Sequence, residues 1–96
     1  MTKPLSGLRV LDLSAALSGP FCSLILGDMG AEVIKIEPPG GEIFRGMGPY
    51  FRGGWSAYFV GINRNKRGIV LNLRTPAGRD AFYDLTRLSD VVLDNY

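Results

Sequence analysis

The stretch LRVLDLSAALSGPFCSLILGDMGAEVIKI, residues 8–36, decides the fold. Residues 8–13 (LRVLDL) and residues 33–36 (VIKI) are short, mostly apolar runs, which are typical of buried strands. The segment between them predicts a helix, so the order is strand, helix and strand within about 30 residues. Such a βαβ unit implies that its two strands run parallel.

The predicted helix has recognisable ends. Ser18 or Gly19 is the expected N-cap, and Pro20 suits the first helical turn. Gly30 stands where a left-handed C-cap is needed. Between these ends, apolar residues recur at helical spacing: Phe21, Leu24, Ile25 and Met29.

The same pattern returns near the end of the chain. Residues 69–73 (IVLNL) predict a third strand and residues 91–93 (VVL) a fourth. Between them, Thr75 and Pro76 predict the N-cap and the first residue of a second helix. One face of that helix is expected to carry Ala77, Ala81, Leu85 and Leu88. The sequence therefore predicts an α/β fold with a parallel sheet built from two βαβ units.

A long segment, residues 38–67, joins the two units, and we call it the excursion. It holds three of the six prolines, seven of the 13 glycines and six aromatic residues. Loops of this length are usually functional or disordered, and six aromatic rings argue against disorder because they need cover. We expect an ordered, mostly irregular segment with a short helical turn near residues 56–61.

Charge is unevenly distributed, although the net charge is only +2. Between Arg45 and Arg79 there are seven basic residues and no acidic one, whereas the rest of the chain has four basic and nine acidic residues. This imbalance indicates an anionic partner for the middle segment. A nucleic acid is disfavoured, because the NRNKR run at residues 63–67 leads into a buried strand and not into a recognition helix. A small ligand with several phosphates would use the same charges.

Glu37 closes the second strand, where a dinucleotide-binding fold places an acid for a ribose hydroxyl. The glycine fingerprint of that fold is missing, because residues 13–21 contain only Gly19 where three glycines are required. A nicotinamide or flavin dinucleotide is therefore disfavoured. The simpler expectation is that Glu37 pairs with Lys35 or with an arginine of the excursion.

Other reactive residue types assemble no catalytic constellation. Cys22 lies in the first turn of the first helix, but the chain has no histidine to activate it, so a small buried residue is expected. Asp80 and Asp84 lie off the apolar face of the second helix, which indicates a solvated surface. One cysteine and no histidine also exclude a Cys/His metal cluster.

The chain lacks the apolar run of roughly 20 residues that a membrane span needs, and its first residues lack the apolar core of a signal peptide. We therefore expect no membrane partner and a cytoplasmic location. The single cysteine fits a reducing compartment.

Four blocks agree in order and spacing with one known family: PLSGLRVLDLS (4–14), SGPFCSLILGDMGAEVIKIEPPGG (18–41), NRNKRGIVLNLRTPAGRDAF (63–82) and SDVVLDNY (89–96). They resemble the opening of the class III CoA-transferases, which include formyl-CoA transferase, the carnitine CoA-transferase and the related 2-methylacyl-CoA racemase. The resemblance implies a Rossmann-like large domain that binds CoA. Residues 1–96 would be the N-terminal segment of that domain, and their sheet an incomplete part of it. It also implies a homodimer of interlocked chains.

The reaction implied by the resemblance passes CoA from an acyl-CoA donor to a carboxylic acid, through a catalytic aspartate that comes after residues 89–96. CoA and acyl-CoA are then substrates, no cofactor is permanently bound, and the 96-residue chain alone is expected to be inactive. The long excursion is more similar to the transferase branch than to the racemase branch. Two alternatives stay open: an acyl-CoA racemase of the same family, and a truncated, non-catalytic module that binds CoA or a nucleotide.

The resemblance also assigns nine residues to the wall that binds CoA: Ala16, Leu17, Ser18, Leu71, Asn72, Leu73, Arg74, Asn95 and Tyr96. Arg74 would provide the cation for a phosphate at the adenosine end. Two positions depart from the family. Pro38 stands where many members place an arginine near the adenine, and residues 15–17 lack the polar side chains that some transferases place beside the acyl group. Because of the second departure, the sequence does not indicate which carboxylic acid is the acceptor.

Overall fold

The computed structural model describes residues 2–96 and shows an α/β chain built on a parallel four-stranded sheet. The sheet strands are β1 (Arg9–Asp12), β2 (Glu32–Glu37), β5 (Arg67–Val70) and β6 (Val91–Leu93). The helices are α1 (Ser18–Asp28), α2 (Ala57–Ile62) and α3 (Pro76–Arg87). The excursion adds the 3-10 helix η1 (Ile43–Gly46) and a hairpin of β3 (Phe51–Arg52) and β4 (Trp55–Ser56). The predicted fold class is confirmed.

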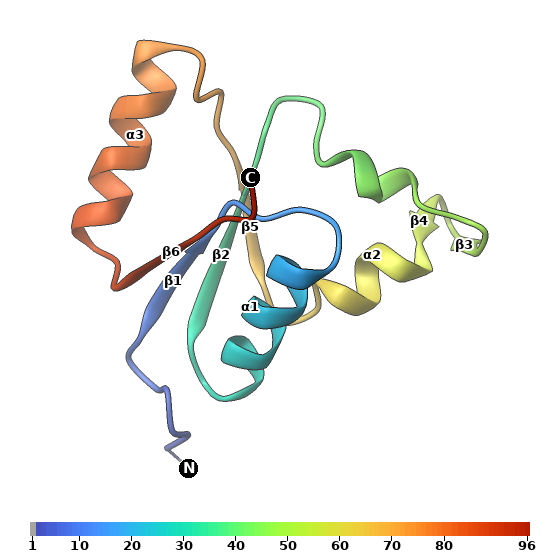
Figure 1. Cartoon of the computed structure of the whole chain (residues 1–96), viewed down its shortest axis with the longest axis horizontal. Coiled ribbons are helices and arrows are strands. Elements are labelled where there is room, and N and C mark those ends of the chain that lie inside the picture. The colour runs from blue at the N-terminus through green and yellow to red at the C-terminus, as the bar shows by residue number, and fades with distance from the viewer. Residues whose placement is uncertain (1) are drawn as a thin grey trace.

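The order of the sheet is β5-β2-β1-β6, and all neighbours run parallel. Val10 of β1 lies opposite Val33 of β2 on one side and Val91 of β6 on the other. Numbered in chain order, these strands give 3-2-1-4, which is the first four strands of the Rossmann order 3-2-1-4-5-6. Because the strands are parallel, their carboxyl ends meet at one edge, where the chain also ends (Figure 1).

The second βαβ unit does not form a neighbouring pair, since β5 and β6 occupy the two outer edges of the sheet. The sequence does not predict this arrangement, because β1 and β2 each leave one edge free and either strand could take it. The two connections cross the sheet in opposite directions, so right-handed crossovers put α1 and α3 on opposite faces. In Figure 1 these helices lie on either side of the strands.

The core is small and covers both faces of the two central strands, since the consecutive residues Val10 and Leu11 of β1 are both fully buried. Its buried apolar side chains are Val10, Leu11, Leu24, Ala31, Val33, Ile36 and Phe59. The face of α1 that packs on the sheet carries mostly small residues, including Gly19, Ser23 and Gly27. A β-carbon on Gly19 would overlap the Ser14 side chain, so only glycine allows the first turn to lie this close to the end of β1.

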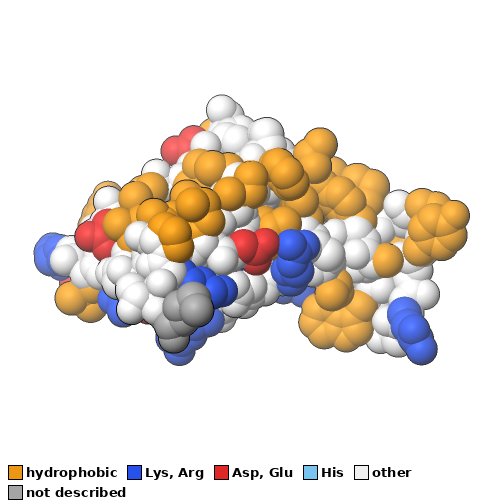
Figure 2. Space-filling model, turned by 90° about the horizontal axis from the view of Figure 1, so that it is seen from below, with side chains coloured by type: hydrophobic (Ala, Val, Ile, Leu, Met, Phe, Trp, Pro, Cys, Tyr) orange, Lys and Arg blue, Asp and Glu red, His pale blue; other side chains and the backbone are white. Residues whose placement is uncertain are grey.

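The apolar series recognised in α1 is mostly exposed. Only Leu24 of that series is buried, whereas Phe21 is 52% exposed and both Ile25 and Met29 exceed 40%. Helix α3 has no buried residue, and Leu88 of its predicted apolar face is 66% exposed. Hydrophobic side chains accordingly form a broad band across the surface seen in Figure 2.

Of the two ends of α1, only the C-terminal end follows the predicted local signal. Leu17, and not Ser18 or Gly19, is the N-cap of α1, and it makes no side-chain capping bond. At the other end Gly30 has a φ of +108°, and the Gly30 amide donates to Gly27 O and the Ala31 amide to Leu26 O. These two bonds make the Schellman ending that glycine favours.

The other predicted helix signals are confirmed. Thr75 Oγ1 accepts from the Gly78 amide at 3.1 Å, and Pro76 is the first residue of α3. In the excursion, Ser56 Oγ caps α2 by accepting from the Phe59 amide at 3.2 Å. The predicted turn near residues 56–61 is therefore a short α-helix.

Candidate ligand-binding groove

A groove of about 720 Å³ lies at the carboxyl edge of the sheet. Its walls come from the segments that follow all four strands, including Leu13 and Ala15 after β1 and Pro38 and Pro39 after β2. Five of the nine predicted residues line it: Leu71, Asn72, Leu73, Arg74 and Tyr96. In doubly wound folds ligands bind outside the carboxyl ends of the strands, where the strand order reverses. The groove lies outside the carboxyl ends of the strands, mostly beside β2 and β5, and it reaches the reversal between β1 and β6 at Ala15 and Tyr96.

Leu71, Asn72 and Leu73 reach the groove because they have left the sheet. The strand predicted over residues 69–73 ends at Val70, and the Leu71 amide then donates to Glu37 O at 3.0 Å. This bond holds the start of the β5–α3 connection beside the end of β2. The sequence alone overestimates the strand because residues 71–73 keep its alternating apolar pattern.

The other four predicted residues do not line the groove. Ala15 lines it where Ala16 was expected, and Leu17 and Ser18 are exposed at the start of α1. The Asn95 side chain accepts from the Ala15 amide at 3.0 Å and donates to Ala15 O at 2.7 Å. Asn95 therefore acts through the loop after β1.

That loop is held by side chains at every backbone polar group from Ser14 to Ala16. The Ser14 amide donates to Asp12 Oδ1 at 2.9 Å, and Ser14 O accepts from Lys35 Nζ at 3.0 Å. Asn95 forms hydrogen bonds with both the amide and the carbonyl of Ala15. These contacts come from β1, from β2 and from the end of the chain.

Ala16 completes the series and has an unusual backbone. The Ala16 amide donates to Glu42 Oε2 at 3.1 Å, and Ala16 O accepts from the Tyr58 hydroxyl at 2.7 Å. Its φ of +69° is in the left-handed region, which L residues other than asparagine and aspartate seldom adopt. Lys35 Nζ also lies 2.6 Å from Glu42 Oε1, and both side chains of this ion pair are buried.

Asp12 is fully buried beneath this loop. Burial alone would raise its pKa, but hydrogen bonds from Ser14 and Ser23, together with the Lys66 ammonium at 3.2 Å, lower the pKa below its ordinary value. Burial lowers the pKa of Lys66, and the attraction of Asp12 offsets this only in part. Lys66 Nζ also donates to Pro20 O and to Asn63 Oδ1, so the ammonium is well solvated by protein groups.

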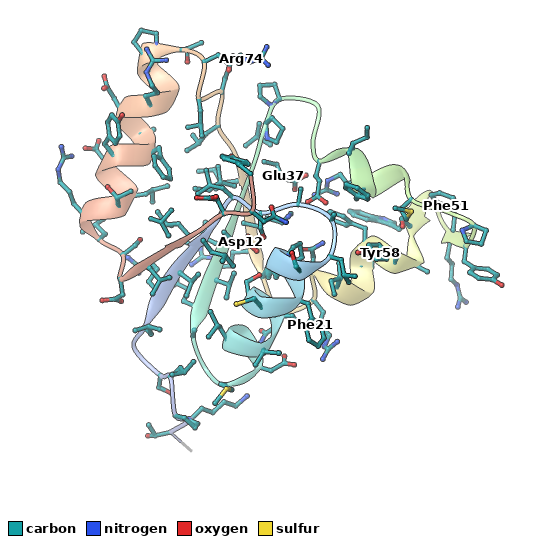
Figure 3. The ribbon with its side chains drawn as sticks, in the orientation of Figure 1. Asp12, Phe21, Glu37, Phe51, Tyr58 and Arg74 are labelled. Carbon is teal, nitrogen blue, oxygen red and sulfur yellow. The ribbon has the colours of Figure 1, made fainter. Side chains whose placement is uncertain are left out.

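Glu37 pairs with an arginine of the excursion, as one of the sequence alternatives predicted. Its carboxylate accepts from Arg45 Nε at 2.7 Å and from the Glu42 amide at 2.7 Å. The Arg45 hydrogen bond, which outweighs burial, lowers the pKa of Glu37. Because this carboxylate is committed to Arg45 and to the backbone, it is not placed as a free acceptor for a ribose hydroxyl. Figure 3 shows Glu37 and Asp12 at the end of the sheet and Tyr58 on α2.

The basic middle of the chain is largely neutralised by acids from elsewhere in the fold. Four of its seven cations form ion pairs: Arg45 with Glu37, Arg64 with Asp28, Lys66 with Asp12 and Arg67 with Glu32. The charge imbalance counted along the sequence is therefore largely offset within the fold, and only part of the segment's positive charge stays available to an anionic ligand. Charge counted along the sequence cannot detect partners that the fold brings in from a distance.

Arg74 remains free for a ligand. Within residues 2–96 it has no acidic partner, and its side chain is exposed at the groove (Figure 3). The Arg74 amide donates to Asn72 Oδ1 at 3.1 Å, which fixes the backbone just before α3. Arg79 lies nearby, since its guanidinium donates to Leu73 O at 3.2 Å. Two arginines with no acidic partner among residues 2–96 thus lie beside the β5–α3 segment.

The remaining candidates gain no role from the structure. Cys22 is exposed, so the prediction of a buried thiol is wrong; it faces away from the sheet because Ser23 and Leu24 take the inner positions. Asp84 pairs with Arg87 on the exposed face of α3, in keeping with a solvated surface. Across residues 2–96 no group of three or more His, Cys, Asp or Glu side chains could hold a metal ion.

No helix in the described part of the chain, residues 2–96, is long and apolar enough to cross a membrane.

Comparison with known proteins gives a consistent result over nearly the whole chain. Residues 5–96 match the family described as CoA-transferase family III. The chain is 47% identical over 95 residues to succinyl-CoA:glutarate CoA-transferase of Mus musculus, which covers 98% of this chain and 22% of that protein. It is 45% identical over 96 residues to succinyl-CoA:mesaconate CoA-transferase of Haloarcula marismortui, covering 96% of this chain and 24% of the relative.

Among solved structures, a CAIB/BAIF family protein from Brucella suis superposes with a TM-score of 0.91 at 40% identity. The alignment covers 100% of this chain and 26% of that protein. The chain thus spans between 22% and 26% of the length of the proteins it matches here.

Proposed function

This chain belongs to CoA-transferase family III, and from that membership we propose that it is part of an enzyme that moves CoA from an acyl-CoA donor to a carboxylic acid. The relatives' names pair an acyl-CoA with a free acid: succinyl-CoA with glutarate or with mesaconate, and formyl-CoA with oxalate. The donor and acceptor of this protein belong to the same chemical classes in our proposal. CoA enters as a substrate, with no permanently bound cofactor.

The observation that carries the proposal is the groove at the carboxyl edge of the sheet. Its walls at Leu71 and Leu73 are apolar and suit the adenine ring, while Arg74 offers a charged donor to a phosphate of CoA. Arg74 also precedes the N-terminus of α3, and a helix N-terminus favours anions. We assign the adenosine and phosphate end of CoA to this side of the groove.

The thioester end is assigned to the opposite side, at the loop after β1. Ala15 lines the groove there, and Leu17 and Ser18 follow at the start of α1. Tyr96 lines the groove beside them, and Asn95 holds the loop by its two bonds to Ala15. CoA would then lie across the ends of the strands from Arg74 towards Ala15.

We place the nucleophile of the reaction outside residues 2–96. Asp12 lies nearest the loop, but it is fully buried and its two carboxylate oxygens accept bonds from Ser14, Ser23 and Lys66. A carboxylate that attacks a thioester needs access to the substrate and a free lone pair. These residues therefore bind and orient CoA in our proposal, and they do not form the covalent intermediates.

We also propose a homodimer for the whole protein, as the family resemblance implies, and a cytoplasmic location, since the single cysteine fits a reducing compartment. Sedimentation of the purified protein and fractionation of the source cells would test these two points.

A transfer assay tests the proposed function directly. The full protein that carries these 96 residues is incubated with succinyl-CoA and with glutarate, mesaconate or oxalate, and the CoA esters are followed by mass spectrometry. We expect a new acyl-CoA that grows as succinyl-CoA is consumed. Hydrolysis alone would contradict the proposal. Inversion of a 2-methylacyl-CoA without exchange would favour the racemase, and CoA binding without turnover would favour the non-catalytic module.

A further inference from the structure

Ala16 is a non-glycine residue in the left-handed conformation, at the point where the chain turns from β1 into α1. Its φ is +69°, and α1 begins two residues later at Ser18. The β-carbon of an L residue makes this backbone conformation unfavourable, so contacts from outside the loop must hold Ala16 in it. The conformation matters for binding, because it sets the direction in which the Leu17 and Ser18 backbone leaves the groove wall at Ala15.

Two side chains of the excursion hold both polar groups of Ala16. Glu42 Oε2 accepts from its amide at 3.1 Å, and the Tyr58 hydroxyl donates to its carbonyl at 2.7 Å. Neither partner is adjacent in sequence, since they follow Ala16 by 26 and 42 residues. The excursion therefore reaches back over the sheet edge to fix one residue.

Glu42 is itself held rigidly. Its side chain is only 5% exposed, and Oε1 lies 2.6 Å from Lys35 Nζ. Lys35 in turn donates to Ser14 O at 3.0 Å, two residues before Ala16. The ion pair thus spans the loop: Lys35 donates to the Ser14 carbonyl before Ala15, and Glu42 accepts from the Ala16 amide after it.

We propose that Glu42 and Tyr58 are positioning residues that hold Ala16 in the left-handed conformation, and so fix the loop that faces the bound thioester. The ligand named here rests on the proposed CoA-transferase function, while the positioning itself does not. Without these contacts Ala16 relaxes to a negative φ, and the start of α1 turns away from its place beside the groove. Glycine at position 16 has no such bias, because it lacks the β-carbon.

Tyr58→Phe is the first test, since it removes one hydrogen bond without leaving a buried charge unpaired. We expect the affinity for CoA, measured by calorimetry, to fall about tenfold, which corresponds to about 1.4 kcal/mol. Adding Ala16→Gly should restore the affinity to within about threefold of the original protein, because glycine accepts the left-handed conformation unaided. Tyr83→Phe is the matched control, because Tyr83 is half exposed on α3. Failure of glycine to restore binding would overturn the proposal.

A second pair of variants tests Glu42 with the charge held constant. Lys35→Met combined with Glu42→Gln keeps an acceptor for the Ala16 amide, whereas Lys35→Met combined with Glu42→Leu removes it. Both double variants lose the Lys35 bond to Ser14 O, so that loss cancels in the comparison, and we expect the second to bind CoA about tenfold more weakly than the first. Ala16→Gly should again restore the loss. If Glu42 touched the ligand directly, or only supported folding, glycine at position 16 would restore nothing.

Hydrogen exchange at the Ala16 amide separates this proposal from the assignment of CoA as ligand. In the Lys35→Met, Glu42→Leu variant we expect that amide to exchange at least about tenfold faster, while amides of β1 keep their rates. An unchanged rate at Ala16 would overturn the positioning role. Should the protein fail to bind CoA but show the faster exchange, the proposed function would fall and the positioning role would stand.

Discussion

Asp12 and Glu37 are buried carboxylates at the ends of neighbouring strands, and each is stabilised as an anion by specific donors. Burial acts against the charge of Asp12, and bonds from Ser14 and Ser23 with the Lys66 ammonium overcome it. For Glu37 the Arg45 hydrogen bond is the largest influence. The pKa values of both groups are lower in the folded chain than in a free side chain. These two acids therefore link folding to pH.

We predict that the free energy of unfolding falls in acid. The ordinary pKa values are 3.8 for Asp12 and 4.5 for Glu37, and the folded chain lowers both. As the pH falls, the unfolded chain binds protons first, so stability is complete above about pH 5 and is lost below it. Urea unfolding between about pH 3 and pH 7 measures the slope. Glu37→Gln should make the acid slope shallower, and an unchanged slope would contradict the role of Glu37.

Gly19 provides a second test at the scale of one residue. A β-carbon there would overlap the side chain of Ser14, so Gly19→Ala should destabilise the protein by about 1–3 kcal/mol. Gly61→Ala is the control: it lies in α2 with no atom within 4 Å of the added carbon, and should be neutral or slightly stabilising. Thermal unfolding of the two variants compares them. Equal effects would show that the contact between α1 and the loop is not tight.

Single residues also show what the sequence could reveal. Lys35 stands inside an apolar strand, and a lysine in such a run must find an anion or a carbonyl when it is buried. That signal predicts a buried partner but does not identify it. Glu42 and Tyr58 could not be assigned to Ala16, because the contacts depend on how the excursion folds back. The left-handed backbone of Ala16 has no sequence signature, since glycine or asparagine would be expected there.

At the scale of elements, the NRNKR run (residues 63–67), which leads into β5, stabilises the fold through its ion pairs. Arg64 forms an ion pair with Asp28, the last residue of α1. The buried Lys66 side chain forms an ion pair with Asp12, beneath the loop after β1. The run therefore ties α1 and β1 to the end of the excursion. The start of α3 and the end of α1 were well predicted, because Thr75, Pro76 and Gly30 act locally, whereas the predicted N-cap of α1 was wrong. The inward face of α1 was not, because small residues at the helix–sheet contact leave the larger ones outside.

We predict that replacing Lys66 lowers the free energy of unfolding much more than replacing Arg64 in the same run. Lys66→Met leaves the fully buried Asp12 without its cation and should cost about 3–5 kcal/mol in stability. Arg64→Met removes an ion pair whose side chains are 59% and 44% exposed, so it should cost less than about 1 kcal/mol. Denaturant unfolding of both variants measures this contrast. Similar costs would contradict a structural role specific to Lys66.

At the scale of the whole molecule, the sequence predicts a parallel α/β sheet but not the positions of its edge strands. The edges depend on long-range pairing, which the local pattern does not encode. The groove was predicted only in part: residues 71–74 and Tyr96 line it, while the other predicted residues, Ala16, Leu17, Ser18 and Asn95, do not. The groove and Arg74, which has no acidic partner within residues 2–96, lie at the same edge of the sheet, and this supports our proposal that the chain binds CoA.

Calorimetric titration of CoA into the full protein that carries this chain, and into its Arg74→Ala and Arg64→Ala variants, tests that claim most directly. We predict that Arg74→Ala weakens binding by about 1–3 kcal/mol, the usual value for a hydrogen bond to a charged group. Arg64→Ala should leave the affinity nearly unchanged, because Arg64 pairs with Asp28 away from the groove. A parallel titration with dephospho-CoA shows whether Arg74 holds the terminal phosphate. Unchanged affinity for CoA in Arg74→Ala would contradict the account.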